Sequence, residues 1–153
     1  MRMPENLTLR KAIPDDSEFA YQTKKAAYRE YVDVVWGWDE EEQRQYHQRE
    51  FTSQGLWITQ SAGMDIGVLK VVREPDALHV DHIFILPEYQ NRGVGATFIM
   101  GVLRDASSSR LSVRLRVLII NNRALAFYSR LGFLETGRTA NHVMMEKPTS
   151  TVS

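Results

Sequence analysis

The chain has 153 residues, of which 43% are hydrophobic and 25% are charged, and its 19 basic and 19 acidic residues give a formal net charge of zero. This length suits one domain with a core of ordinary size. The neutral balance argues against broad binding to nucleic acid, which needs a concentrated basic face. Because cysteine is absent, disulfides, zinc–thiolate sites and a thiol nucleophile are excluded.

The sequence predicts neither a signal peptide nor a membrane span. The N-terminus has no apolar core for a signal peptide, and no apolar run approaches the roughly 18 residues of a membrane span. We therefore expect a cytoplasmic protein without membrane contact. Residues 1–148 are expected to form a single domain, and the small polar residues 149–153 a disordered tail.

The first third of the chain predicts one strand and two helices. Residues 7–12 alternate weakly and predict the strand. Capping residues at 14–17 predict a helix from there to Tyr31. A second, mostly polar helix is predicted from Asp39, which can cap it, to Phe51, on the surface. Residues 34–38, with two tryptophans, are expected to connect the two helices.

Strands dominate the next segment. Residues 56–59 and 66–72 flank the turn at 62–65 and predict a hairpin. Residues 78–86 predict a third strand, which would complete an antiparallel meander.

The last third alternates helices and strands. The four-residue spacing of apolar side chains predicts a helix over 94–107. A strand over 112–120 and a helix over 123–131 follow, the latter ending at Gly132, a typical C-terminal cap. Residues 134–138 and 143–147 predict two closing strands. Together these elements indicate one α/β domain.

The segment Gln90-Asn91-Arg92-Gly93-Val94-Gly95-Ala96 joins a strand to a helix. Its glycines allow the backbone to approach a ligand, and N–H groups at a helix N-terminus favour a phosphate. A tight connection without a ligand is an equally good interpretation of the loop alone. A P-loop is excluded because Ala96 and Thr97 follow Gly95, and a dinucleotide fingerprint because residue 98 is phenylalanine.

The same residues resemble the acetyl-CoA motif of the GNAT acetyltransferases, Arg/Gln-x-x-Gly-x-Gly/Ala. A second motif, Asn121-x-x-Ala124-x-x-Phe127-Tyr128-x-x-x-Gly132-Phe133, is similar to the C-terminal motif of that family. The predicted element order also agrees with the family fold, a mixed, mostly antiparallel twisted sheet of about six to seven strands flanked by four helices.

This resemblance implies an acetyl-CoA-dependent N-acetyltransferase that moves an acetyl group to a primary amine by direct transfer in a ternary complex. The acceptor is a small molecule or a protein, and a homodimer is among the assemblies that the resemblance allows. A non-catalytic acyl-CoA sensor with the same fold is the main alternative. Transfer to an oxygen acceptor is a third.

The resemblance also implies roles for individual residues. Residues 90–96 would hold the pyrophosphate, and the backbone of Ile83 and Ile85 would contact the pantetheine, a form of strand addition. Tyr128 would act as general acid toward the sulfur. Asn121 would cap the last helix, bind the pantetheine amide, or do both.

The general base and the acceptor site are left more open. His79 and Asp81 share one face of a strand and are the candidate bases, although both are also ordinary solvated positions. No metal is expected, because His79 and His82 lie on opposite faces of the strand.

The acceptor is expected near the junction of the first two helices. Trp36 and Trp38 would wall a pocket there, and Asp39 and Glu42 would attract a cationic amine. An acidic start to the second helix that complements its dipole explains the two carboxylates equally well.

Overall fold

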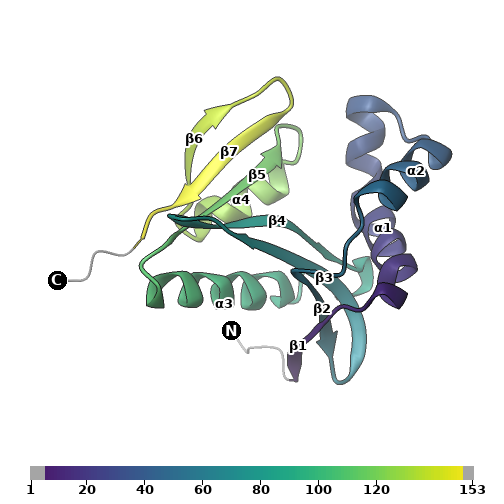
Figure 1. The fold of residues 1–153 in the computed structure, drawn as a ribbon. Coiled ribbons are helices and arrows are strands. Elements are labelled where there is room, and N and C mark those ends of the chain that lie inside the picture. The colour runs from purple at the N-terminus through teal and green to yellow at the C-terminus, as the bar shows by residue number, and fades with distance from the viewer. Residues whose placement is uncertain (1–5, 150–153) are drawn as a thin grey trace. The chain divides into compact units, whose positions relative to one another are not determined.

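The structure, a computed structural model, describes residues 6–149 (Figure 1). Within this range the strands are β1 (Leu7–Lys11), β2 (Leu56–Ser61), β3 (Met64–Arg73), β4 (Ala77–Ile85), β5 (Ser112–Leu118), β6 (Leu134–Arg138) and β7 (His142–Lys147). The α-helices are α1 (Ser17–Trp36), α2 (Glu40–Glu50), α3 (Val94–Ser108) and α4 (Asn122–Arg130). Two 3₁₀ turns, η1 (Pro14–Asp16) and η2 (Pro87–Tyr89), precede α1 and α3.

Hydrogen bonds join the seven strands into one sheet in the order β1-β2-β3-β4-β5-β7-β6. The pairs β1–β2, β2–β3, β5–β7 and β6–β7 are antiparallel. The pair β4–β5 is parallel, with residues 77–79 opposite residues 112–114. The predicted α/β class, with a mixed and mostly antiparallel sheet and four helices, is therefore confirmed.

The chain divides into two compact units. The first comprises residues up to Lys70 together with His82–Thr97, and the second comprises Val71–Asp81 together with the residues from Phe98 onward. β3, β4 and α3 each run from one unit into the other.

The first unit is built on a small apolar core beneath α1. Ala12, Ala20, Leu56, Ile58 and Val68 are buried together, and three phenylalanines pack against them. Burial of this apolar surface is the main favourable term in folding the unit.

A charged cluster ties β1 to the start of α1. The Arg10 guanidinium donates to both carboxylate oxygens of Asp16, at 2.9 and 2.8 Å, and also to Asp65. These hydrogen bonds hold the pKa of the Asp16 carboxyl below its usual range. The cluster fixes where α1 leaves the sheet.

Helix α1 is longer than predicted. It continues past Tyr31 to Trp36 and ends at Gly37, whose φ of +79° is a left-handed conformation that favours glycine. The prediction that residues 34–38 form a connection is therefore wrong for Val34 to Trp36. The stop signal is Gly37, and the valines and tryptophan before it tolerate a helix.

Helix α2 begins where it was predicted and has no buried residue. The Asp39 carboxylate caps it by accepting a hydrogen bond from the Glu42 backbone N–H at 3.0 Å. Arg44 connects α2 to α1: it pairs with Glu18 at 2.6 Å and lies 3.9 Å above the centre of the Tyr21 ring. Because α2 has no buried side chain to hold it against the core, its position depends on these contacts with α1.

The second unit packs the last strands with α4. In β5, Val113, Leu115 and Val117 are buried, as the alternating pattern predicts. Helix α4 is followed by Gly132, with φ +95°. Of the predicted tail, Thr149 donates its backbone N–H to the Ser112 hydroxyl at 3.2 Å, and residues 150–153 lie outside the described range.

No helix in residues 6–149 is both long and apolar enough to span a membrane.

Gly67 in β3 tests the packing of the first unit. A Cβ at this position would overlap the Phe84 carbonyl oxygen and lie 2.6 Å from the Thr59 hydroxyl and 2.9 Å from a methyl group of Ile85. The Gly67→Ala variant should therefore lose about 1–3 kcal/mol of unfolding free energy, the usual cost of overpacking. Urea denaturation measures it, with Gly137→Ala as the control because the space at Gly137 is open. Equal stability of both variants would contradict the close packing at Gly67.

Candidate active site

The segment between β4 and α3 is held in place by hydrogen bonds to β3 and β4. After η2, the Gln90 side-chain amide donates to the Ile85 carbonyl at 2.8 Å. The Leu86 backbone N–H donates to the Ile66 carbonyl at 2.9 Å. Gln90, predicted to contact the coenzyme, thus has an observed structural role, because it anchors the loop to the end of the strand.

Two left-handed residues reverse the chain within this loop. Asn91 has φ +63° and Gly93 has φ +77°. The Gly93 carbonyl then accepts both the backbone N–H and the hydroxyl of Thr97, at 3.0 and 2.9 Å. Helix α3 therefore begins immediately after the turn. Glycine at 93 is explained by the backbone conformation itself.

The backbone conformation does not explain why residue 95 is a glycine. It lies in the first turn of α3, its φ is not left-handed, and a Cβ placed there would meet nothing within 4 Å. The packing of the protein therefore does not require glycine at this position. The lack of a side chain leaves open space beside the start of the helix.

The electrostatics of the loop favour an anion. The first N–H groups of a helix have no carbonyl partner within it, and the helix dipole is positive at this end. The exposed Arg92 adds a cation, with its guanidinium 5.8 Å from the centre of the Tyr89 ring. Val94 and Ala96 complete the predicted anion-binding segment within the same unit.

The end of β4 belongs to this unit too. Ile83 and Ile85 alternate with His82 and Phe84, whose rings stack at 5.2 Å with an interplanar angle of 13°. The Phe84 ring also contacts Tyr28 of α1 at 5.3 Å. One unit thus brings together the loop and the two isoleucines predicted to contact the pantetheine.

The second unit contains the predicted acid. Tyr128 of α4 is 8% exposed, and its ring makes edge-on contacts with Phe127 and Phe133 at 5.0 and 5.3 Å. Burial raises the pKa of the Tyr128 phenol above its usual value. The phenol is therefore protonated throughout the neutral range, as a proton donor must be.

Asn121 caps α4. Its side-chain oxygen accepts the Ala124 backbone N–H at 3.1 Å. This confirms the predicted capping role. The capping bond occupies the oxygen of the side-chain amide, whereas the amide nitrogen is the group that can donate.

His79 and Asp81, the candidate bases, lie in the part of β4 that belongs to the second unit. Their spacing puts both on one face of the strand. His79 is half-buried and stands opposite Arg114 of β5, which pairs with Asp76 and Glu146 at 2.8 and 2.6 Å. Asp81 is exposed.

The four residues predicted to bind the acceptor lie where α1 meets α2. Trp36 is 55% exposed at the end of α1. Trp38 is half-buried: its backbone N–H donates to Asp33 and its indole N–H to Glu40, both at 2.9 Å. Asp39 caps α2, and Glu42 is exposed in the first turn of that helix. Acceptor binding by these residues stays a prediction.

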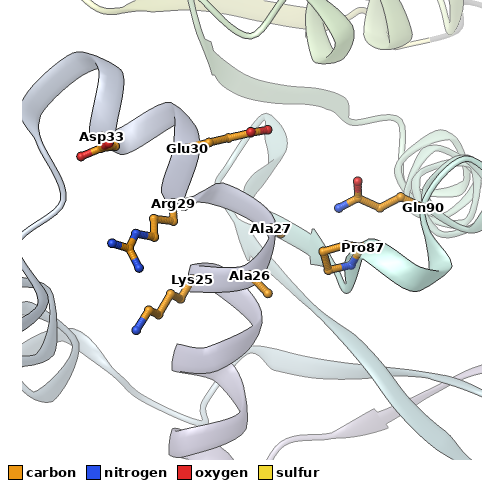
Figure 2. Close-up of a pocket in the computed structure, with 8 residues that line it drawn as sticks. All are labelled: Lys25, Ala26, Ala27, Arg29, Glu30, Asp33, Pro87 and Gln90. Carbon is orange, nitrogen blue, oxygen red and sulfur yellow. The ribbon is translucent and has the colours of Figure 1, made fainter.

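A nearby pocket has a different lining. It has a volume of about 510 Å³ and lies between α1 and the loop (Figure 2). Its lining consists of Lys25, Ala26, Ala27, Arg29, Glu30, Asp33, Pro87 and Gln90. Of the predicted site residues, this lining includes Gln90. The sequence analysis missed the charged residues of α1, because polar side chains on an amphipathic helix usually mark a solvated face.

In residues 6–149 no three His, Cys, Asp or Glu side chains come together in a metal-binding group.

Comparison with known proteins identifies the family of the chain. Residues 20–145 match the family model described as an acetyltransferase (GNAT) domain. No curated protein sequence matches the chain significantly.

Solved structures of similar fold cover nearly the whole chain. The PaiA N-acetyltransferase of Thermoplasma acidophilum, solved in complex with coenzyme A, is 15% identical, with a TM-score of 0.78 over 94% of this chain and 99% of its own. The ribosomal-protein-S18-alanine N-acetyltransferase of Escherichia coli is 18% identical, with a TM-score of 0.71 over 96% of each chain. Ard1 from Thermoplasma volcanium is 19% identical, with a TM-score of 0.68 over 94% of this chain and 98% of its own.

The family match covers most of the chain and includes both the loop at residues 90–96 and the helix that carries Tyr128. The chain is an acyltransferase that belongs to the GNAT N-acetyltransferase family.

Proposed function

We propose that the chain transfers the acetyl group of acetyl-CoA to a primary amine, by direct attack in a ternary complex. The loop at residues 90–96 is the observation that carries this proposal, because its left-handed turn and the open position at Gly95 present backbone N–H groups to a pyrophosphate. The two compact units act together as one acetyltransferase domain, since the family model takes in residues of both.

The pantetheine arm pairs with the backbone of β4 at Ile83 and Ile85, as an added strand would. A backbone N–H there polarises the thioester carbonyl. The Asn121 side-chain amide nitrogen donates to the arm, because its oxygen is already used to cap α4.

Tyr128 protonates the departing sulfur. Its hydroxyl is a neutral donor, because burial keeps the pKa of the phenol above its usual value. His79 or Asp81 accepts the proton of the attacking ammonium, directly or through water. An acyl-enzyme on a thiol is excluded because the chain has no cysteine.

The Gly95→Glu variant tests the loop, because the family motif accepts alanine at this position but no acidic side chain. The new Cβ meets no protein atom within 4 Å, and glutamate is more favourable than glycine in a helix, especially in its first turn. The variant should therefore fold as the wild type does, yet bind coenzyme A at least ~10-fold more weakly, because its carboxylate repels the pyrophosphate. Calorimetry measures the binding.

Gly101→Glu is the matched control in the same helix, because it adds the same charge outside the loop and its Cβ would find only the end of the Arg104 side chain, at 3.8 Å. It should keep full coenzyme affinity. Wild-type affinity in Gly95→Glu would contradict the phosphate-binding role of the loop.

The Tyr128→Phe variant tests the acid. It keeps the ring and its contacts with Phe127 and Phe133, so coenzyme binding and stability should change little. Loss of the proton donor should lower kcat by ~10²–10⁴-fold and change KM less. The measurement is steady-state release of coenzyme A thiol, with Tyr46→Phe on the exposed face of α2 as control. A kcat within about threefold of wild type would assign Tyr128 to packing alone.

The pH–rate profile tests the base. Replacing the true base, in His79→Ala or Asp81→Asn, should lower kcat/KM near neutral pH. High pH should restore much of it, because the amine then loses its proton unaided. Profiles identical to wild type in both variants would show that neither residue is the base.

A further inference from the structure

One face of α2 lies against α1, although none of its side chains is fully buried. This face includes the half-buried Arg44 and His47. At the start of α2, the Glu40 carboxylate lies 2.9 Å from the Lys25 ammonium. In its last turn, His47 contacts Ser17, the first residue of α1. The two helices therefore run in opposite directions, and polar and aromatic contacts hold them together.

His47 is the residue of this face whose charge can change near neutral pH. Its Nε2 lies 2.9 Å from the Ser17 hydroxyl oxygen. Its ring stands edge-on to that of Tyr21, 5.4 Å between centres, and lies 5.1 Å from that of Phe51. Tyr21 is buried and stays neutral, because burial raises the pKa of its phenol. Phe51 packs against the apolar core of the unit. The imidazole thus connects α2 both to α1 and to the residue that anchors its end.

The surroundings of His47 favour its neutral form. Burial is the largest cause that lowers the pKa of the imidazole, and the nearby charges of Lys24 and Arg44 lower it further. The contact with Ser17 and the charge of Glu18 oppose this shift. The Glu18 carboxylate, however, already accepts two hydrogen bonds from Arg44, at 2.6 and 2.9 Å. It therefore offers an imidazolium little compensation.

We propose that His47 is a pH-sensitive latch, which holds α2 on α1 at neutral pH and releases it when the imidazole is protonated. Protonation places a third positive charge beside Lys24 and Arg44 in a half-buried position. The Ser17 hydroxyl can donate or accept, so its hydrogen bond to the ring survives protonation. The penalty therefore comes from burial of the charge and from repulsion between the cations.

The direction of the pH dependence follows from the lowered pKa of His47. The pKa is lower with α2 docked on α1 than with α2 released, so the released form binds the proton more tightly. Docking is therefore at full strength above about pH 6.5, the ordinary pKa of histidine. It weakens as the pH falls below that value.

Release also affects the other end of α2. The Glu40 carboxylate contacts Lys25 and accepts the indole N–H of Trp38, both at 2.9 Å. Gly37 and Gly55, on either side of α2, have φ values of +79° and +76°, and glycines of this kind let the chain turn. Movement of α2 would break the contact that positions Trp38, which is predicted to bind the acceptor. The latch itself needs neither acceptor nor coenzyme.

Hydrogen exchange of the α2 amides at about pH 7.5 and about pH 5 tests the latch. Protection factors, which correct for the intrinsic effect of pH on exchange, are compared. Glu18 and Glu40 stay ionised at both values, because the pKa of each is about 2. In the wild type, α2 protection should fall at least ~3-fold at the lower pH, while β5 keeps its protection. His47→Gln, whose neutral amide can still bond to Ser17, should show equal α2 protection at both pH values.

His142→Gln is the matched control, because His142 is also half-buried with a lowered pKa but belongs to the second unit. Its α2 protection should fall as in the wild type. Constant α2 protection in the wild type, or an equal fall in His47→Gln, would overturn the proposal. NMR titration of the His47 ring gives a second readout. The pKa should lie below about 6.5, and a value at or above this would also overturn the latch.

Discussion

The left-handed turn at Asn91 and Gly93 is the constraint on which the proposed coenzyme site depends. It places the start of α3 directly after the turn, and the Gln90 side chain anchors the turn to the Ile85 carbonyl at the end of β4. Because the turn is held by the protein's own hydrogen bonds, its conformation does not depend on a bound ligand. Binding then requires little reordering of the backbone, and preorganisation of this kind favours affinity.

A second set of contacts positions α2 against α1. Helix α2 has no buried residue, so its place against α1 depends on Arg44 stacked over Tyr21 and on the ion pairs of Glu18 and Glu40. The Glu40 carboxylate engages Lys25 and also holds the Trp38 indole, whose ring lies beside Arg29. The helix pair thus sets which charges of α1 remain available to a ligand.

Much of this could be predicted from the sequence, because local rules decide it. The Asp39 and Asn121 caps and the alternation in β5 follow from capping chemistry and strand periodicity. The end of α1 was missed because Gly37 was not interpreted as its stop signal. The Gln90–Ile85 bond and the charged lining at Arg29 and Glu30 could not be predicted, because both depend on how elements distant in sequence meet.

In the proposed mechanism, backbone N–H groups at the start of α3 bind the pyrophosphate of the coenzyme. A titration of ¹⁵N-labelled protein with coenzyme A, followed by amide NMR, tests this binding. The amide signals of Gly93, Val94, Gly95 and Ala96 should shift most, and adenosine 3′,5′-bisphosphate, which lacks the pyrophosphate, should shift them less. Saturation by coenzyme A with these four signals unmoved would contradict pyrophosphate binding at the start of α3.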